Sequence, residues 1–163
     1  MVLEKLIRAV PDIGGIHLLI RGNKRHPDAR DRFFEEIATS SVFDRLRQDD
    51  NEAFETFIED RVHCVTGEVT EPLFGLSADR FRKLAGGIDV VVNSAASVSF
   101  REELDKALAI NTRCLDNVAE LARQNKSLAV LQVSTCYVNG FNQGHIHETV
   151  TVPARANITR HKE

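Results

Sequence analysis

Residues 88–96, "IDVVVNSAA", decide the fold of this chain, because an unbroken β-branched run gives way there to small and polar residues. A continuous apolar run without alternation is typical of a strand that is buried on both faces, as strands are in parallel sheets. Other short apolar runs have the same character: "IHLLIR" (16–21), "VHCV" (62–65) and "LAVLQVS" (128–134). The chain therefore contains several candidate strands of the buried type.

The segments between these runs have apolar residues at helical spacing. Residues 2–10 give the first such pattern, with a shared apolar face: Val2, Leu3, Leu6, Ile7 and Val10. Further helices are predicted at 28–40, around 41–47 with Ser41 as N-cap, at 51–61, at 77–85 with Ser77 as N-cap, and at 101–124. Strands that alternate with helices predict a doubly wound, mostly parallel sheet in a Rossmann-like α/β domain.

Length and composition are those of one ordinary globular domain. The chain has 163 residues, 42% of them hydrophobic, and its 21 basic and 24 acidic residues give a net charge of −3. This charge balance does not indicate binding to nucleic acid or to an anionic membrane surface. No apolar run approaches the roughly 20 residues of a membrane helix. We expect residues 1–140 to hold the strands and helices, and 141–163, which are polar and lack periodicity, to form an irregular tail.

Cysteine usage and the N-terminus favour a cytoplasmic setting. Cys64, Cys114 and Cys136 are odd in number, lie far apart and lack metal-ligand spacing, which favours a reducing compartment. "MVLEKLIRAV" (1–10) mixes charges with aliphatic residues, unlike a signal peptide. His145 and His147 form an H-x-H pair without a third ligand nearby, so no metal site is predicted.

The carboxyl ends of the predicted strands are small or polar: "IRGN", "TGEVT", "NSAAS" and "VSTCY". Ligands of open α/β sheets bind outside these ends. In a dinucleotide-binding fold the second strand ends near the adenine ribose, where an Arg pairs with a 2′-phosphate. Arg21 has that position, followed by Lys24 and Arg25. A solvated basic loop is the alternative interpretation.

Two further stretches fit a site at this edge. The small residues of "NSAA" (93–96) would let a backbone approach a phosphate or the nicotinamide ribose, although close helix–strand packing would also explain them. "GEVT" (67–70) could be a simple turn. Asn111 lies within a predicted helix, where Asn is mildly unfavourable. It could hold a water molecule or a backbone group near the site, or be an exposed polar residue.

Taken together, these motifs resemble one family. "VLEKLIRAVPDIGGIHLLIRGNK" (2–24), "FDRLR" (43–47), "GEVTEPLFGLS" (67–77), "DVVVNSAASVSF" (89–100) and "VSTCYVNGF" (133–141) follow the order of the alcohol-forming fatty acyl-CoA reductases. These enzymes form the male-sterility or thioester-reductase branch of the extended short-chain dehydrogenases. The motifs here most resemble those of bacterial members. The resemblance covers about residues 2–150. It implies NADPH-dependent reduction of an acyl thioester to an aldehyde and then to a fatty alcohol.

The resemblance also implies roles for the strand ends. Arg21 would meet the 2′-phosphate of NADPH, and Glu68 and Val69 would lie by the adenine. The pyrophosphate and nicotinamide ribose would be lined by Asn93, Ser94, Ala95 and Ala96. The chain departs from the family at Glu68, where Asp is usual, and at Asn93, where His is frequent. The expected partner is a fatty acyl-CoA, with membrane contact only through that substrate.

Ser134 and Thr135 look like the hydroxyl member of the family's catalytic triad, which a Tyr-x-x-x-Lys motif completes. Tyr137 is followed four residues later by Phe141, so it is not that tyrosine. Neighbours on a strand point to opposite sides, and we expect Thr135 to face the cofactor. The alternative is that both hydroxyls only satisfy the backbone of a turn.

The family also has a first strand and a glycine-rich loop before the segment that matches residues 2–10. We therefore expect the chain to be a partial NADPH-binding domain, inactive by itself, which could associate with itself because its central strand is missing. Two other functions remain open. One is another extended short-chain dehydrogenase, in particular a thioester reductase that releases the aldehyde. The other is a non-catalytic half-domain that pairs with another chain.

Overall fold

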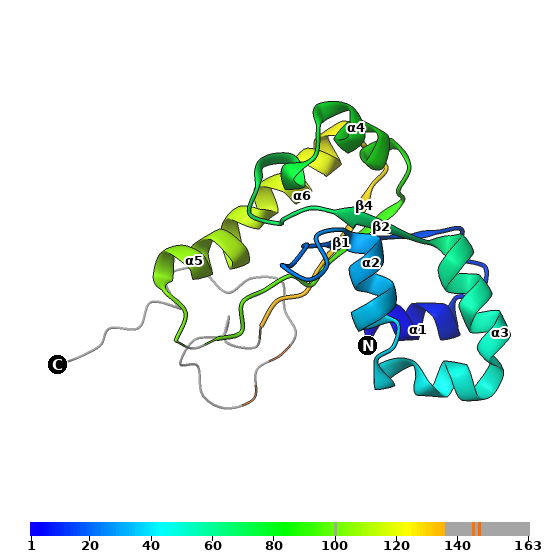
Figure 1. Cartoon of the computed structure of the whole chain (residues 1–163). Coiled ribbons are helices and arrows are strands. Elements are labelled where there is room, and N and C mark those ends of the chain that lie inside the picture. Colours follow the sequence, from blue (N-terminus) through cyan, green and yellow to red (C-terminus); the bar gives the residue numbers. More distant parts are fainter. Residues whose placement is uncertain (100, 136–144, 146, 148–163) are drawn as a thin grey trace.

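The computed structural model describes residues 1–99, 101–135, 145 and 147 (Figure 1). Tyr137, Cys136 and most of the predicted tail at 141–163 lie outside the described residues. The first half contains α1 (Val2–Ala9), β1 (Ile16–Ile20), α2 (Ala29–Arg32), the π-helical turn η1 (Phe33–Ile37), the 3₁₀ turn η2 (Ser41–Phe43), α3 (Asp44–Arg61) and β2 (Val62–Thr66). The second half contains η3 (Pro72–Gly75), α4 (Ala78–Gly86), β3 (Val90–Asn93), α5 (Leu104–Leu108), the π-helical turn η4 (Ala109–Arg113), α6 (Cys114–Gln124) and β4 (Ala129–Gln132).

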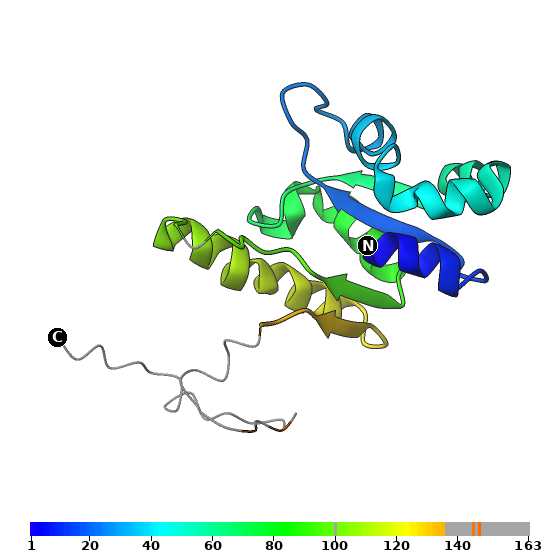
Figure 2. The same ribbon diagram turned by 90° about the horizontal axis from the view of Figure 1, so that it is seen from below.

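The strands pair in parallel, as their buried apolar sequences predicted. β1 pairs with β2 from Ile16 opposite Val62 to Ile20 opposite Thr66. β3 pairs with β4 from Val90 opposite Ala129 to Asn93 opposite Gln132. Within the described residues these pairs are separate two-stranded sheets, and Figure 2 shows them lying apart. The parallel α/β prediction is confirmed, and the sheet is divided in two.

Helices pack on both sides of the strand layer (Figure 1). On one side, residues of α1, α2, η1 and α3 enclose a core with one face of β1 and β2, including Ile16, Phe33 and Val62. On the other side, Leu19, Val65 and Val91 pack against a cluster of α4, α6 and η3 residues that includes Phe81 and Leu121. Because β1 sends Ile16 and Ile20 into one core and Leu19 toward the other, its sequence is apolar without alternation.

The β3–β4 pair is covered less completely than the β1–β2 pair. Val91 is packed against the α4–α6 cluster. Its neighbours Val90 and Val92 point to the opposite face, since side chains alternate along a strand, and Val90 is 57% exposed. Leu131, which pairs with Val92, is 55% exposed. One apolar face of this pair is therefore open to solvent within the described part of the chain.

The helices differ from expectation in three details. Ser77 caps α4 as predicted, but the cap before η2 is Ser40, not Ser41. The two segments predicted at 41–47 and 51–61 are separated by a kink in α3 at Asp50, whose φ of −163° is extended. The single helix predicted at 101–124 is interrupted by η4. No helix in the described ranges is both long and apolar enough to cross a bilayer.

Candidate functional site

A cavity of about 310 Å³ opens at the carboxyl ends of β1, β2 and β3. We call it the strand-end cavity, and its lining residues are Leu19, Arg21, Arg32, Gly67, Glu68, Val69, Ala95, Ala96 and Ile110. The strand ends supply most of this list because parallel strands direct their carboxyl ends to one edge. Five residues predicted from sequence meet here: Arg21, Glu68, Val69, Ala95 and Ala96.

Arg21 and Glu68 join the ends of two adjacent strands across the cavity. Nη1 of Arg21 donates a hydrogen bond to Oε2 of Glu68 at 3.5 Å. The Arg21 side chain is 71% exposed, so the ion pair itself adds little stability. A guanidinium has five N–H donors. Arg21 can therefore bind an anion with its remaining donors while one donor stays bonded to Glu68.

Arg32 brings a second guanidinium to the strand-end cavity, which sequence reasoning missed. Its Nη1 donates to the backbone carbonyl of Arg21, and its Nε donates to Oε2 of Glu36 at 3.0 Å. A hydrogen bond from Asn23, together with that from Arg32, lowers the pKa of Glu36, which keeps this carboxylate charged. The position of Arg32 in the sequence could have indicated its role. The helix after β1 begins beside the end of that strand, and Arg32 lies one turn into this helix.

The start of α2 is tied to the end of β2. Asp28 is the N-cap, and its Oδ1 accepts from the backbone N–H of Arg30 at 2.7 Å. Thr66 accepts from the N–H of Ala29 at 2.9 Å and donates to Oδ2 of Asp28 at 3.2 Å. The backbone hydrogen bond from Arg30 is the main cause that lowers the pKa of the Asp28 carboxyl. These contacts fix the helix that presents Arg32.

The loop after β2 needs glycine where it enters the cavity. A Cβ on Gly67 would lie 2.5 Å from the carbonyl oxygen of Phe74 and 2.7 Å from Cδ1 of Leu19. The backbone then folds back on itself, and the N–H of Glu68 donates to that Phe74 carbonyl at 3.0 Å. The sequence predicts "GEVT" (67–70) as a site stretch or a simple turn, and its first three residues, Gly67, Glu68 and Val69, line the cavity.

The small residues after β3 form the opposite wall. Ala95 and Ala96 line the cavity, whereas Ser94 is exposed outside it. Asn93 is buried, and its amide donates to Oε1 of Gln132 at 2.7 Å and accepts from the N–H of Ala95 at 3.3 Å. Asn93 therefore shapes the turn that carries the alanines and does not itself line the cavity.

Asn111 holds a backbone group, one of the alternatives that its sequence position left open. Its Oδ1 accepts from the N–H of Ser97 at 2.7 Å, and its Nδ2 donates to the Ser97 carbonyl at 3.1 Å. Asn111 belongs to η4, whose Ile110 lines the cavity. π-helical turns of this kind are frequent at functional sites. Asn111 thus joins η4 to the loop that continues from the alanines.

Besides Asn93, Ser94 and Asn111, three more predicted site residues lie outside the cavity lining. Lys24 is exposed on the loop after β1. Ser134 and Thr135 are exposed just beyond the end of β4. Their catalytic roles stay predictions, and the tyrosine that would accompany them is not identified among the described residues.

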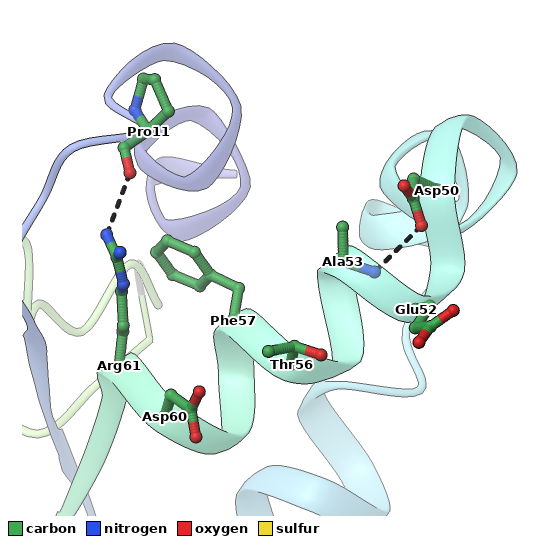
Figure 3. A pocket seen from close by; sticks show the side chains of 8 residues that line it. All are labelled: Pro11, Asp50, Glu52, Ala53, Thr56, Phe57, Asp60 and Arg61. Atoms are coloured by element: carbon green, nitrogen blue, oxygen red, sulfur yellow. Dashed lines mark hydrogen bonds between the residues drawn. The ribbon is translucent and has the colours of Figure 1, made fainter.

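A second cavity, of about 460 Å³, lies along α3, beside Pro11 just after α1 (Figure 3). Its wall includes Pro11, just before β1, and Arg61, just before β2. Arg61 donates to the carbonyls of Pro11 at 3.0 Å and Ile13 at 2.8 Å, which fastens the chain between α1 and β1. The remaining charged lining residues are acidic: Asp50, Glu52 and Asp60. An anionic cofactor would therefore favour the strand-end cavity.

Comparison with known proteins assigns the family. A family model described as male sterility protein matches residues 1–162. The chain belongs to the male sterility protein family. The resemblance found in the sequence motifs is thereby confirmed.

Curated relatives include two plant reductases. The chain is 37% identical over 149 residues to "Fatty acyl-CoA reductase 2, chloroplastic" of Arabidopsis thaliana, covering 91% of this chain and 24% of that protein. It is 33% identical over 148 residues to "Alcohol-forming fatty acyl-CoA reductase" of Simmondsia chinensis, covering 90% of this chain and 30% of that protein. The chain thus spans less than a third of the length of these relatives.

Solved structures confirm the Rossmann-like fold. The terminal R domain from the myxalamid PKS-NRPS biosynthetic pathway has a TM-score of 0.70 at 21% identity, covering 97% of this chain and 37% of that one. A reductase (R) domain of a nonribosomal peptide synthetase from Mycobacterium tuberculosis has a TM-score of 0.61 at 27% identity, covering 85% and 30%.

The family model is an NAD-binding one, so the cofactor class of the family is a nicotinamide dinucleotide. The strand-end cavity fits such a group. Arg21 and Arg32 suit phosphate oxygens, Val69 and Ile110 offer apolar contact to a ring, and Ala95 and Ala96 allow close backbone approach.

Proposed function

We propose that the protein carrying this chain reduces fatty acyl-CoA thioesters with NADPH, and that the strand-end cavity binds the adenosine half of the cofactor. The convergence of Arg21 and Arg32 on this cavity carries the proposal. Support for the substrate class comes from relatives named as fatty acyl-CoA reductases. The second candidate function is that of a thioester reductase that releases the aldehyde, and the similarity to reductase (R) domains supports it.

The charges at the cavity favour NADPH over NADH. An NADH site typically has an acidic residue at the end of the second strand to bind the ribose hydroxyls, whereas an Arg accommodates the 2′-phosphate. Arg21 follows β1, which corresponds to that second strand by the resemblance to the family, whose first strand precedes the segment matching residues 2–10. The carboxylate of Glu68 already accepts a hydrogen bond from Arg21. Lys24 adds positive charge on the adjoining loop.

In the proposed reaction NADPH, when bound, supplies the hydride that reaches the thioester carbonyl carbon. Negative charge then develops on the carbonyl oxygen, and a positioned hydroxyl stabilises it by donating a hydrogen bond. Thr135 is our candidate for this donor, with Ser134 as the neighbour that points away. Arg21, Glu68 and the alanine turn orient the cofactor and do not take part in proton transfer.

Replacing Arg21 tests the cofactor assignment. In the full-length protein, Arg21→Ala should raise the KM for NADPH roughly 10- to 100-fold, since hydrogen bonds to charged groups contribute about 1.5–3 kcal/mol. The KM for NADH should change less than about 2-fold, because NADH lacks the 2′-phosphate. The measurement is steady-state oxidation of each cofactor with a long-chain acyl-CoA such as palmitoyl-CoA.

Arg25→Ala is the matched control, because Arg25 is an exposed cation of the same loop that does not line the cavity. It should leave both KM values nearly unchanged. If Arg21→Ala raises the KM for NADPH and the KM for NADH by the same factor, Arg21 does not contact the 2′-phosphate. Failure of the unaltered protein to oxidise either cofactor with an acyl-CoA would reject the proposed reaction.

A further inference from the structure

Asn117 is a buried polar side chain of α6 whose contacts all cross to the loop after β2. The residue is 8% exposed. Its Nδ2 donates to the carbonyls of Val69 at 3.0 Å and Glu71 at 2.8 Å, and its Oδ1 accepts from the N–H of Leu73 at 2.8 Å. Both amide protons and the amide oxygen are therefore used on one distant segment.

The segment that Asn117 holds has an unfavourable backbone. Leu73 and Phe74 adopt φ values of 53° and 58°, in the left-handed region that non-glycine residues seldom occupy. Such residues persist only when their surroundings hold them. Burial of the Phe74 ring beside Phe81, at 5.9 Å between centroids, is one restraint. The Asn117 amide is another, and it acts on the backbone itself.

This loop is also one wall of the strand-end cavity. Val69 lines the cavity and gives its carbonyl to Asn117. Glu68, the preceding residue, lines it too and reaches Arg21. A chain of contacts thus runs from α6 through the loop to the guanidinium that faces the proposed 2′-phosphate.

We propose that Asn117 is a positioning residue for the adenosine half of NADPH, acting through the loop that carries Glu68 and Val69. This inference rests on the proposed function. Without the amide, the partly buried Val69 carbonyl and Leu73 N–H lose the hydrogen bonds that Asn117 makes to them, and the Glu71 carbonyl keeps only that from the N–H of Phe74. The loop then relaxes from its left-handed conformation. Val69 and Glu68 then move from the cavity wall, and Arg21 loses its support.

Asn125, at the end of the same helix, provides a matched control. Its Nδ2 donates to the carbonyls of Ala85 at 2.9 Å and Ile88 at 2.8 Å. Ala85 lies in the last turn of α4 and Ile88 in the connection from α4 to β3, and neither lines the strand-end cavity. Asn125 therefore fastens a backbone segment as Asn117 does, but away from the proposed cofactor.

The experiment compares Asn117→Ala with Asn125→Ala in the full-length protein. Both should lower the Tm. Only Asn117→Ala should raise the Kd of NADPH, and the Ki of 2′,5′-ADP as a competitor, by roughly 5-fold or more. The kcat at saturating NADPH and the KM for the acyl-CoA should change less than about 2-fold. Asn117→Asp keeps the acceptor for Leu73 but sets a carboxylate oxygen against the carbonyls of Val69 and Glu71, so it should raise the Kd at least as much as Asn117→Ala. Asn117→Ser, which leaves one hydroxyl in place of the amide, should raise the Kd less and serves if Asn117→Ala does not fold.

Equal effects of the two alanine substitutions on the Kd of NADPH would overturn the inference, because Asn117 would then be structural only. An Asn117→Asp protein with unaltered NADPH affinity would also overturn it. If the unaltered protein binds neither NADPH nor 2′,5′-ADP, the proposed function itself has failed. That result is recognised before any variant is compared.

Discussion

At the residue scale, the hydroxyls beyond β4 decide whether the chain contributes to the chemical step. In the full-length protein, Thr135→Ala should lower kcat by roughly 10²–10³, the loss that follows removal of an oxyanion donor, with the KM for NADPH nearly unchanged. Thr135→Ser should retain much of the activity because the O–H survives. Steady-state kinetics of these variants and of Ser134→Ala check this. A larger loss in Ser134→Ala would mean that Ser134 is the donor.

Individual residues of the site differ in how well the sequence revealed them. Arg21, Ala95 and Ala96 could be predicted because each follows an apolar strand, and topology alone brings strand ends together. Arg32 and Asn117 could not, since their roles depend on contacts across the fold that no local pattern encodes. The sequence predicts Asn93 and Asn111 as site residues, and both lie close to the cavity. They bond to neighbouring backbone or side-chain groups there and do not line the cavity.

At the scale of elements, the junction of α2 with β2 gives the structure a pH dependence. The pKa of Asp28 is lowered from its ordinary 3.8 chiefly by the backbone N–H of Arg30. Its stabilising contribution is therefore present above the unfolded pKa and is lost as the pH falls through the lower folded pKa. Asp28→Ala should lower the Tm at neutral pH, and the difference from the unaltered protein should shrink in acid. Thermal unfolding followed by circular dichroism from pH 7 to 3 measures this.

Asp28→Asn is the control for that experiment, because Asn caps helices but does not titrate. Its Tm should stay closer to that of the unaltered protein at neutral pH than the Tm of Asp28→Ala does. A difference between Asp28→Ala and the unaltered protein that does not change with pH would mean that the carboxylate charge is unimportant at this cap.

The elements themselves were largely predictable, because apolar runs and helical spacing are local signals. The strand predicted at 88–96 is shorter in the structure, Val90–Asn93, since its small residues turn to form the cavity wall. The interruption of the predicted helix 101–124 by η4 left no local signal, because residues on either side still have apolar residues at helical spacing. Asn111 of η4 is hydrogen-bonded to Ser97, which lies outside the helix.

At the scale of the whole molecule, the divided sheet should govern solution behaviour. β1 and β3 each pair on only one side within the described residues, and unpaired strand edges promote association. Residues 1–163 expressed alone should associate with themselves in a concentration-dependent manner. Light scattering coupled to size-exclusion chromatography measures this. Leu131→Lys, on the exposed face of β4, should reduce the association if that face contributes. A cooperative thermal transition from a clean monomer at low concentration would contradict the prediction.

The π-helical turns also affect how this chain should be compared with its relatives. Each makes a hydrogen bond across five residues, from Ala38 to Phe33 and from Cys114 to Ala109, so each contains one residue more than a regular helix would. The π-turn takes up this residue locally, so each later residue faces where the position one earlier would face in a regular helix, a difference of about 100° around the helix axis. A relative whose helix lacks that residue must be aligned with a single-residue gap within 109–113. Without the gap, Asn117 would be matched to a position on a different face, and its counterpart would be missed.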